Sequence, residues 1–416
     1  MNAIAFIILG ALLADLILNL LADGLNLKNL RTELPKSFED IYDAERYQQS
    51  QQYLRVQTRF GWLASVFNLI VLLVFWFAKG FALLDAWVRA FELGPIYSGL
   101  IYIGILLLFK GLLSLPFSIY STFVIEARFG FNKTTPATYM LDLLKGLLLA
   151  VLLGTPLLAA ILAFFEYAGP HAWWYCWIGV TLYMLMVQFV APAWIMPLFN
   201  KFTPLEDGEL KSAILAYARG IKFPLENVYQ MDGSRRSTKS NAFFTGFGRH
   251  KRIVLFDTLI KQHTVKELVA ILAHEMGHYK KKHIRQSLIL GILQTGLMLF
   301  LLGQFITYQG LFDAFYMPQQ SVYAGMLFFA MLYAPIDFFS GLLMQLWSRR
   351  NEAAADQFAA ETTRDPESMV SALKKLSVHN LSNLTPHPFY VFLNYSHPPV
   401  LQRIQTLSNP ALEVTG

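Results

Sequence analysis

The chain has 416 residues, of which 55% are hydrophobic and 15% are charged, and its mean hydropathy is +0.41. These values exclude an ordinary soluble enzyme and indicate several membrane spans. The net charge of +6 comes without a basic stripe interleaved with aromatic residues, so we expect no nucleic-acid partner. The single Cys176 excludes an internal disulfide framework and a cysteine-based metal site.

Seven apolar runs are long enough to cross the hydrocarbon core of a bilayer, which takes about 20 helical residues. Each run is rich in Leu, Ile and Phe, and several end in Trp or Tyr, as membrane-interface segments do. We therefore predict transmembrane helices at roughly 3–22, 61–84, 97–120, 140–165, 172–195, 285–307 and 321–346.

Lys and Arg residues are concentrated in alternate connecting segments. If the N-terminus is outside, the inner segments are 24–60, 121–139, 196–284 and 347–416, and the outer loops hold only Arg89, with Lys79 at a span end. The positive-inside rule therefore places the inner segments in the cytoplasm. We expect four parts: a five-helix membrane domain (1–195), a cytoplasmic catalytic segment (196–284), spans six and seven (285–346) and a C-terminal cytoplasmic segment (347–416).

The segment 196–284 carries patterns typical of a soluble domain. Residues 208–220 read as an amphipathic helix, and residues 241–247 and 252–256 flank Gly248 to Lys251 as the two strands of a hairpin. A strand beside a catalytic helix can hold an extended peptide by backbone hydrogen bonds, with Asn241 and Ala242 as contacts. A purely structural hairpin explains the same pattern equally well.

The strongest motif is His274-Glu275-Met276-Gly277-His278. Histidines four residues apart on a helix share one face and can bind one metal ion, while Glu275 is placed to take a proton from a water that zinc acidifies towards pKa ~7. Thr264 and Glu267 form a capping-box pattern that predicts the helix start. The alternative is a core helix with hydrogen-bonded histidines.

A third ligand is needed, and Glu352 in the Ala-rich segment after Ser348 is the best candidate. Asp356, one turn later, is expected to hydrogen-bond a ligand imidazole from outside the metal shell. A charged helix end after a membrane span would look the same. His397, before two prolines, is predicted to stabilise the oxyanion, although a structural role is also consistent. His283 lies about 180° from His274 on a continued helix, so it is not counted as a ligand.

The chain resembles the integral-membrane zinc metallopeptidases of the CAAX prenyl protease 1 family over nearly its full length. The matching stretches are residues 34–43, 123–135, 197–204, 231–246, 274–278, 349–356 and 397–399. The resemblance implies a mainly α polytopic membrane protein, with seven transmembrane helices forming a chamber and a cytoplasmic α+β zinc-metalloprotease domain. It also implies one Zn²⁺ per chain held by His274, His278 and Glu352, with Glu275 catalytic and Asn241 on a substrate-binding edge strand.

The implied function is that of a zinc-dependent metalloendopeptidase acting on peptide or protein substrates, including lipidated or membrane-derived ones, in contact with membrane lipid. Eukaryotic members cleave C-terminal tripeptides from prenylated proteins. The C-terminus, residues 412–416, lacks a dilysine retrieval signal. This favours a bacterial inner membrane, where prenylated substrates are not expected, over the endoplasmic reticulum.

Two other functions are considered. One is quality control of membrane proteins, as in the HtpX-like heat-shock proteases, which are shorter and have fewer spans. The other is a non-enzymatic seven-helix transporter with a structural metal. No inverted repeat supports the transporter, and structural zinc sites usually have four ligands.

Overall fold

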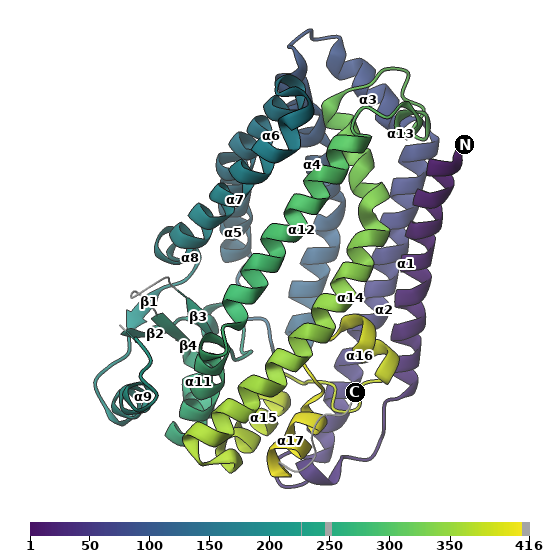
Figure 1. The fold of residues 1–416 in the computed structure, drawn as a ribbon. Helices are drawn as coiled ribbons and strands as arrows, with labels where there is room; N and C mark the ends of the chain where they lie inside the picture. Colours follow the sequence, from purple (N-terminus) through teal and green to yellow (C-terminus); the bar gives the residue numbers. More distant parts are fainter. Residues whose placement is uncertain (226, 246–251, 410–416) are drawn as a thin grey trace.

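The computed structural model describes residues 1–225, 227–245 and 252–409 (Figure 1). Within these residues, seven helical stretches are long and apolar enough to cross a membrane, as predicted. They are α1 (Ala3–Lys28), α2 (Ala44–Phe77), α4–η2 (Pro95–Glu126), α5–η3–α6 (Pro136–Tyr167), η4–α7–η5–α8 (Gly169–Phe199), α12 (His283–Phe305) and α14 (Val322–Thr363).

Two spans differ substantially from their predicted ranges. The second helix starts at Ala44 rather than near 61 and ends at Phe77, because Lys79 adopts a left-handed conformation (φ 60°) and a new helix, α3 (Gly80–Arg89), begins. The seventh does not stop at 346 but continues to Thr363, since the segment after Ser348 is rich in alanine. The end of a membrane-length helix therefore carries Glu352 rigidly into the domain at that end of the bundle.

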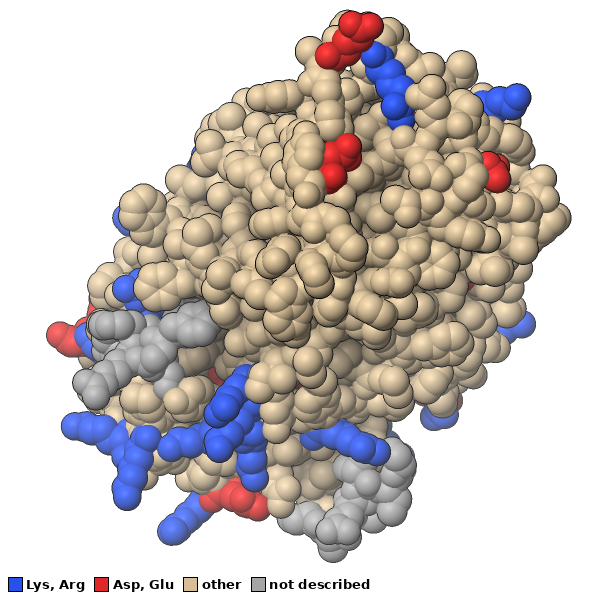
Figure 2. Space-filling view, turned by 45° about the horizontal axis from the view of Figure 1, so that its top comes forward, with Lys and Arg blue, Asp and Glu red and all other residues tan. Residues whose placement is uncertain are grey.

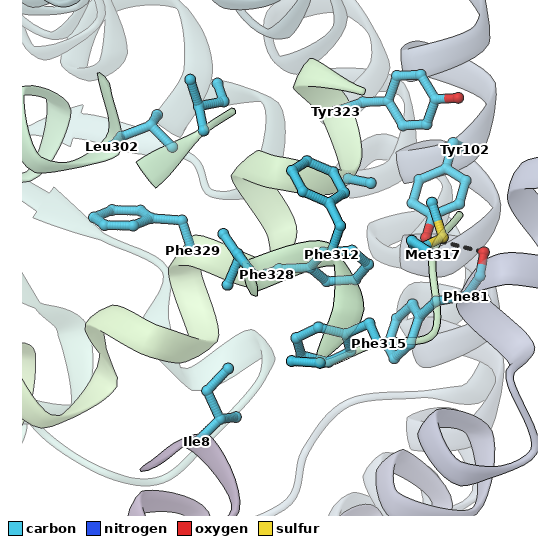
Figure 3. Close-up of a cluster of buried hydrophobic side chains, with 14 of the residues drawn as sticks. Ile8, Phe81, Tyr102, Leu302, Phe312, Phe315, Met317, Tyr323, Phe328 and Phe329 are labelled. Carbon is cyan, nitrogen blue, oxygen red and sulfur yellow. Dashed lines mark hydrogen bonds between the residues drawn. The ribbon is translucent and has the colours of Figure 1, made fainter. Parts of the chain in front are cut away.

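The long helices run side by side, with α3 and α13 (Gln309–Asp313) at one end of the bundle (Figure 1). An aromatic core ties that end together. The Phe315 and Phe328 rings stack with centroids 3.9 Å apart, and Phe81 meets both edge-on (Figure 3). The Trp76 Nε1 donates a hydrogen bond to the Ala314 carbonyl at 2.8 Å. This packing fixes the helices at the end opposite the sheet.

The middle of the molecule presents an apolar surface. Figure 2 shows a broad zone without charged side chains, with many Lys and Arg side chains gathered beyond it at one end. Large apolar side chains are also exposed along the spans: Leu148, Leu152 and Trp194 are 69%, 72% and 75% exposed. Such a surface is unfavourable in water and suits hydrocarbon.

A four-stranded sheet lies at the end opposite α3, with strand order β1-β2-β4-β3. Its strands are β1 (Phe202–Pro204), β2 (Asn227–Met231), β3 (Ala242–Thr245) and β4 (Arg252–Phe256). β4 pairs parallel with β2 and antiparallel with β3, which leaves β3 at an edge. The predicted pairing of 241–247 with 252–256 is confirmed for the described residues; the turn at 248–251 lies outside them, as does the C-terminal stretch 412–416.

The remaining helices at this end are α9 (Glu209–Gly220), α10 (Asp257–Gln262), α11 (Val265–Lys280), α15 (Pro366–His379), α16 (Pro388–Asn394) and α17 (Val400–Ser408). The predicted helix at 208–220 is confirmed by α9. α11 starts with the predicted capping box, and its Leu268, Leu272 and Met276 pack into a core with Ile214 and Leu255 of α9 and β4. α11 is thereby buried between the sheet and the bundle.

Candidate active site

Two helices meet closely at the site: α11, which carries the histidine pair, and α14, which carries Glu352. They are in extensive contact. Gly277 makes this approach possible, because a Cβ there would lie 3.1 Å from Phe358 Cδ1 and 3.3 Å from both the Cα and the carbonyl oxygen of Ala355. A glycine facing an alanine therefore sets the spacing between the two helices.

Three side chains converge at this crossing and form what we call the three-donor group: His274, His278 and Glu352. The Nε2 atoms of His274 and His278 are 3.2 Å apart. Glu352 reaches them with different oxygens: Oε2 is 3.3 Å from His274 Nε2, and Oε1 is 3.3 Å from His278 Nε2. A tetrahedral zinc ion with bonds of about 2.0–2.1 Å sets its ligand atoms about 3.3 Å apart. The separation of the two imidazole nitrogens, and the separation of each from a Glu352 oxygen, are close to that value, with a different carboxylate oxygen facing each histidine.

The chemistry of the three side chains also fits a metal ion. Glu352 is 4% exposed, and its buried Oε2 has no hydrogen-bond partner within the described chain. A buried carboxylate oxygen without a donor is costly unless a cation satisfies it. Among the described residues, His274, His278 and Glu352 form a group whose donor atoms lie within 4.8 Å of one another. Two imidazoles and one carboxylate are a donor set that zinc accepts.

The electrostatics of the site favour a bound cation. Burial lowers the pKa of His274, but the neighbouring carboxylates of Asp356 and Glu352 outweigh the effect of burial and raise the pKa to about 9. The same negative potential that holds a proton on this imidazole would hold a metal ion in its place.

Asp356 lies behind His274, one turn beyond Glu352 on α14. Its Oδ1 is 2.8 Å from His274 Nδ1, the ring nitrogen that faces away from the three-donor group. Arg403 of α17 grips the same carboxylate with two hydrogen bonds, from Nε at 2.7 Å and Nη2 at 2.6 Å. This bidentate pair leaves little freedom to the carboxylate and, through it, to the imidazole. Sequence reasoning missed Arg403, because no local pattern connects it to Asp356.

His397 lies in the turn between α16 and α17, and its Nε2 is 3.2 Å from Glu352 Oε1. Ser396 Oγ is 2.9 Å from the other ring nitrogen, Nδ1. Arg349, three residues before Glu352, donates to the carbonyl oxygens of Val391 at 3.3 Å and Tyr395 at 2.6 Å. α14 therefore anchors this turn as well as supplying the carboxylate, an anchor that sequence reasoning also missed.

Glu275 is adjacent to the first histidine on α11 and is partly buried. Burial raises the pKa of its carboxyl group above the ordinary value, and the nearby His274 and His278 oppose that rise. A carboxylate with a raised pKa accepts a proton more readily near neutral pH than an exposed glutamate does.

Asn241 and Ala242 lie at the start of β3, which packs against α11. The side chain of Asn241 accepts a hydrogen bond from the backbone N–H of Ala242 at 2.9 Å, and the carbonyl of Asn241 accepts one from Phe256 at 3.1 Å. Within the described chain, neither residue hydrogen-bonds to the histidine–glutamate group. Ala242 begins the edge strand of the sheet that the described residues form, and Asn241 directly precedes it.

His283 comes close to the site by a route that sequence reasoning missed. α11 ends at Lys280, so His283 is not on a continued helix, and the predicted 180° separation from His274 is wrong. The chain turns at Lys282, which adopts a left-handed conformation (φ 63°), and His283 Nδ1 lies 3.1 Å from His278 Nδ1. A left-handed lysine has no reliable sequence signal, which is why the turn was not foreseen.

Known proteins resemble this chain over nearly its whole length. The family model "CAAX prenyl protease N-terminal, five membrane helices" matches residues 25–201, and "Peptidase family M48" matches residues 204–411. CAAX prenyl protease 1 of Saccharomyces cerevisiae is 35% identical over 402 residues, covering 90% of this chain and 88% of its own. The Homo sapiens homolog is 30% identical over 422 residues, covering 90% and 89%. The crystal structure of S. mikatae Ste24p matches with a TM-score of 0.92 at 32% identity, covering 98% and 99%.

Proposed function

This chain belongs to peptidase family M48, and from that premise we propose that it is a zinc endopeptidase whose active site lies where α11, α14 and the α16–α17 turn meet. Family membership makes it a multi-pass membrane metalloendopeptidase. The observation that carries the site assignment is the convergence of His274, His278 and Glu352 from two separate helices, with nitrogen and oxygen atoms 3.2–3.3 Å apart.

In this proposal the three residues hold one Zn²⁺ per chain. Bound there, zinc polarises the scissile carbonyl and lowers the pKa of water. Asp356, held by Arg403, keeps the proton of His274 on Nδ1 and so leaves Nε2 free to bind the metal.

Glu275 acts as the general base and then as the general acid. It takes one proton from the attacking water as the new carbon–oxygen bond forms at the substrate carbonyl. It then delivers that proton to the amine nitrogen as the carbon–nitrogen bond breaks. Its raised pKa supports this double role, because the group must both gain and lose a proton within one turnover.

His397 stabilises the oxyanion that develops on the substrate carbonyl. Ser396 Oγ is 2.9 Å from Nδ1, and in this proposal the hydroxyl donates to Nδ1, which leaves the imidazole proton on Nε2, where it can be donated towards the reacting carbonyl. One such donor is worth roughly 10²–10³ in rate. The proximity of Nε2 to Glu352 supports this role, since it places the donor beside the metal-binding group.

The substrate peptide lies along β3 as an added strand. β3 is an edge strand of the sheet formed by the described residues, and it packs against α11, so its outer edge offers a place for an added strand close to the catalytic helix. Asn241 and Ala242, where β3 begins, are the proposed contacts. In this arrangement, 1–195 and 285–346 form the membrane body, and 196–284 with 347–416 form the catalytic part.

We place the catalytic end in the cytoplasm and the chain in a bacterial inner membrane, with the endoplasmic reticulum as the alternative. The gathering of Lys and Arg side chains at one end supports the orientation (Figure 2). The relatives named CAAX prenyl protease 1 support a lipidated or membrane-derived substrate, because this chain covers about 90% of their length. An HtpX-like quality-control role is the second candidate, as it needs the same zinc site but no prenyl group.

The test compares wild type with Glu275→Gln on two probes, a farnesylated peptide with a CAAX end and the same peptide without the lipid. We expect the variant to keep its zinc and its melting temperature but to lose about 10²–10⁴ in rate on any peptide that wild type cleaves. Glu361→Gln, an exposed exchange on α14, is the matched control. Normal cleavage by Glu275→Gln would refute the proposed base. A preference for the farnesylated peptide supports the prenyl-directed substrate; equal cleavage of both favours the quality-control role.

A further inference from the structure

The turn between α11 and α12 places the buried imidazole of His283 next to His278, a proposed zinc ligand, on the side of the His278 ring that carries Nδ1. The backbone N–H groups of Lys281 and Lys282 close α11 by donating to the carbonyls of Gly277 and Tyr279, both at 2.9 Å. Lys282 then takes the left-handed conformation, and α12 starts at His283 in a new direction. His283 is 7% exposed, so its ring is held in place by the surrounding packing.

The two nitrogens of His278 have different neighbours. Its Nε2 faces the three-donor group, at 3.2 Å from His274 Nε2 and 3.3 Å from Glu352 Oε1. Its Nδ1 faces His283 Nδ1 at 3.1 Å, and the two rings are inclined at 72° with centroids 5.2 Å apart. His283 therefore touches only the side of His278 that points away from the proposed metal.

The direction of this hydrogen bond follows from the chemistry of imidazole. A metal binds a nitrogen lone pair, so metal binding through His278 Nε2 requires the ring proton to be on Nδ1. That Nδ1–H can then only donate, and His283 Nδ1 must accept with its own lone pair. The reverse arrangement would put the proton of His278 on Nε2 and block metal binding.

We propose that His283 is a positioning residue: it accepts the Nδ1–H of His278, fixes the tautomer and ring orientation of that ligand, and thereby sets the affinity of the site for zinc. This inference rests on the proposed metal site. It gives each ligand histidine its own outer acceptor, since Asp356 stands behind His274 as His283 stands behind His278. The acceptors differ in kind: one is a carboxylate held by Arg403, and the other is an uncharged ring held by a strained turn.

The test measures the zinc dissociation constant of the full-length protein in detergent by competition with a chromophoric chelator. His283→Phe keeps a ring in the buried space but removes the acceptor, and we expect it to weaken zinc binding about 10–100-fold, the usual cost of losing such a partner. His283→Asn restores an acceptor oxygen near the position of Nδ1, and it should recover most of the affinity. His263→Phe is the matched control, because His263 is equally buried but bonds the Leu259 carbonyl instead.

A second pair of variants alters the turn at Lys282 and leaves the imidazole rings of His278 and His283 in place. Lys282→Gly allows the left-handed turn at no steric cost and should leave zinc affinity unchanged. Lys282→Val disfavours that conformation and should weaken zinc binding in the same direction as His283→Phe. The visible absorption of the cobalt-substituted protein checks that each variant still binds with the same ligand set.

Three results separate the possible failures. If His283→Phe binds zinc as tightly as wild type, the positioning role is wrong while the metal site stands. If His283→Asn is as weak as His283→Phe, the site responds to packing rather than to the acceptor, and the proposal is also wrong. If wild type itself binds no zinc under conditions where it is folded, the proposed function fails instead.

Discussion

Gly277 offers the sharpest perturbation of the site that leaves every proposed ligand in place. In a helix interior, Gly→Ala alone stabilises by about 0.5–1 kcal/mol. Here the added Cβ would lie 3.1–3.3 Å from Phe358 and from the Cα and carbonyl oxygen of Ala355. Phe358 can rotate, but the backbone of α14 can yield only by moving the helix. Overpacking of this kind costs about 1–3 kcal/mol.

The gain in helix propensity and the cost of overpacking act in opposite directions, and we expect the cost to be the larger of the two. We expect Gly277→Ala to lower the free energy of unfolding by about 0–2.5 kcal/mol, the overpacking cost less the propensity gain. We also expect weaker zinc binding, because moving α14 away shifts Glu352 from both histidines while each ligand remains present. The assays are thermal unfolding with a metal chelator present and chelator competition for zinc.

Gly220→Ala is the control for the glycine exchange. Gly220 is the last residue of α9, and a Cβ added there would meet no neighbouring atom within 4 Å outside its own helix backbone. The exchange therefore gains helix propensity without the clash. We expect its stability to be unchanged or higher, with wild-type zinc binding. The reasoning is refuted if Gly277→Ala is as stable as Gly220→Ala and binds zinc as tightly as wild type, because the helix crossing would then tolerate a methyl group.

Two further predictions concern charge pairs around α11. Arg403→Lys keeps the charge but loses the bidentate grip on Asp356, so we expect about 10-fold weaker zinc binding by chelator competition, and wild-type affinity would contradict this. Burial opposes ionisation of Glu267, but Lys375, Ser371 and the Thr264 N–H hold its pKa below the ordinary value of 4.5. Glu267→Gln should therefore lower the melting temperature at pH 7, and the difference from wild type should shrink only as pH falls below that value; a difference constant from pH 7 to acid pH would show that the charge is irrelevant.

The local features of the fold were predictable because short-range patterns encode them. The capping box at Thr264 and Glu267 formed as its spacing indicated, and seven apolar runs became seven membrane-length helices. The pairing of β3 with β4 also followed from the sequence, in which the apolar runs 241–247 and 252–256 flank a short polar stretch. In each case the residues that carry the sequence pattern also form the structural element, or lie within a few positions of it.

The contacts that complete the site were not predictable, because they join distant parts of the chain or depend on backbone conformation. Arg403 meets Asp356 only because α17 packs beside α14, which no local pattern encodes. His283 meets His278 because one lysine is left-handed, which reverses the direction expected for a continued helix. The roles of Asn241 and His397 stay predictions, since their chemistry depends on a bound substrate.

The most direct test of the central claim is anomalous X-ray scattering at the zinc edge from crystals of the wild-type protein. We expect one peak per chain, bonded to His274 Nε2, His278 Nε2 and Glu352 at about 2.0–2.2 Å. A peak bonded to other residues, or no peak between these three side chains in zinc-replete protein, would contradict the account.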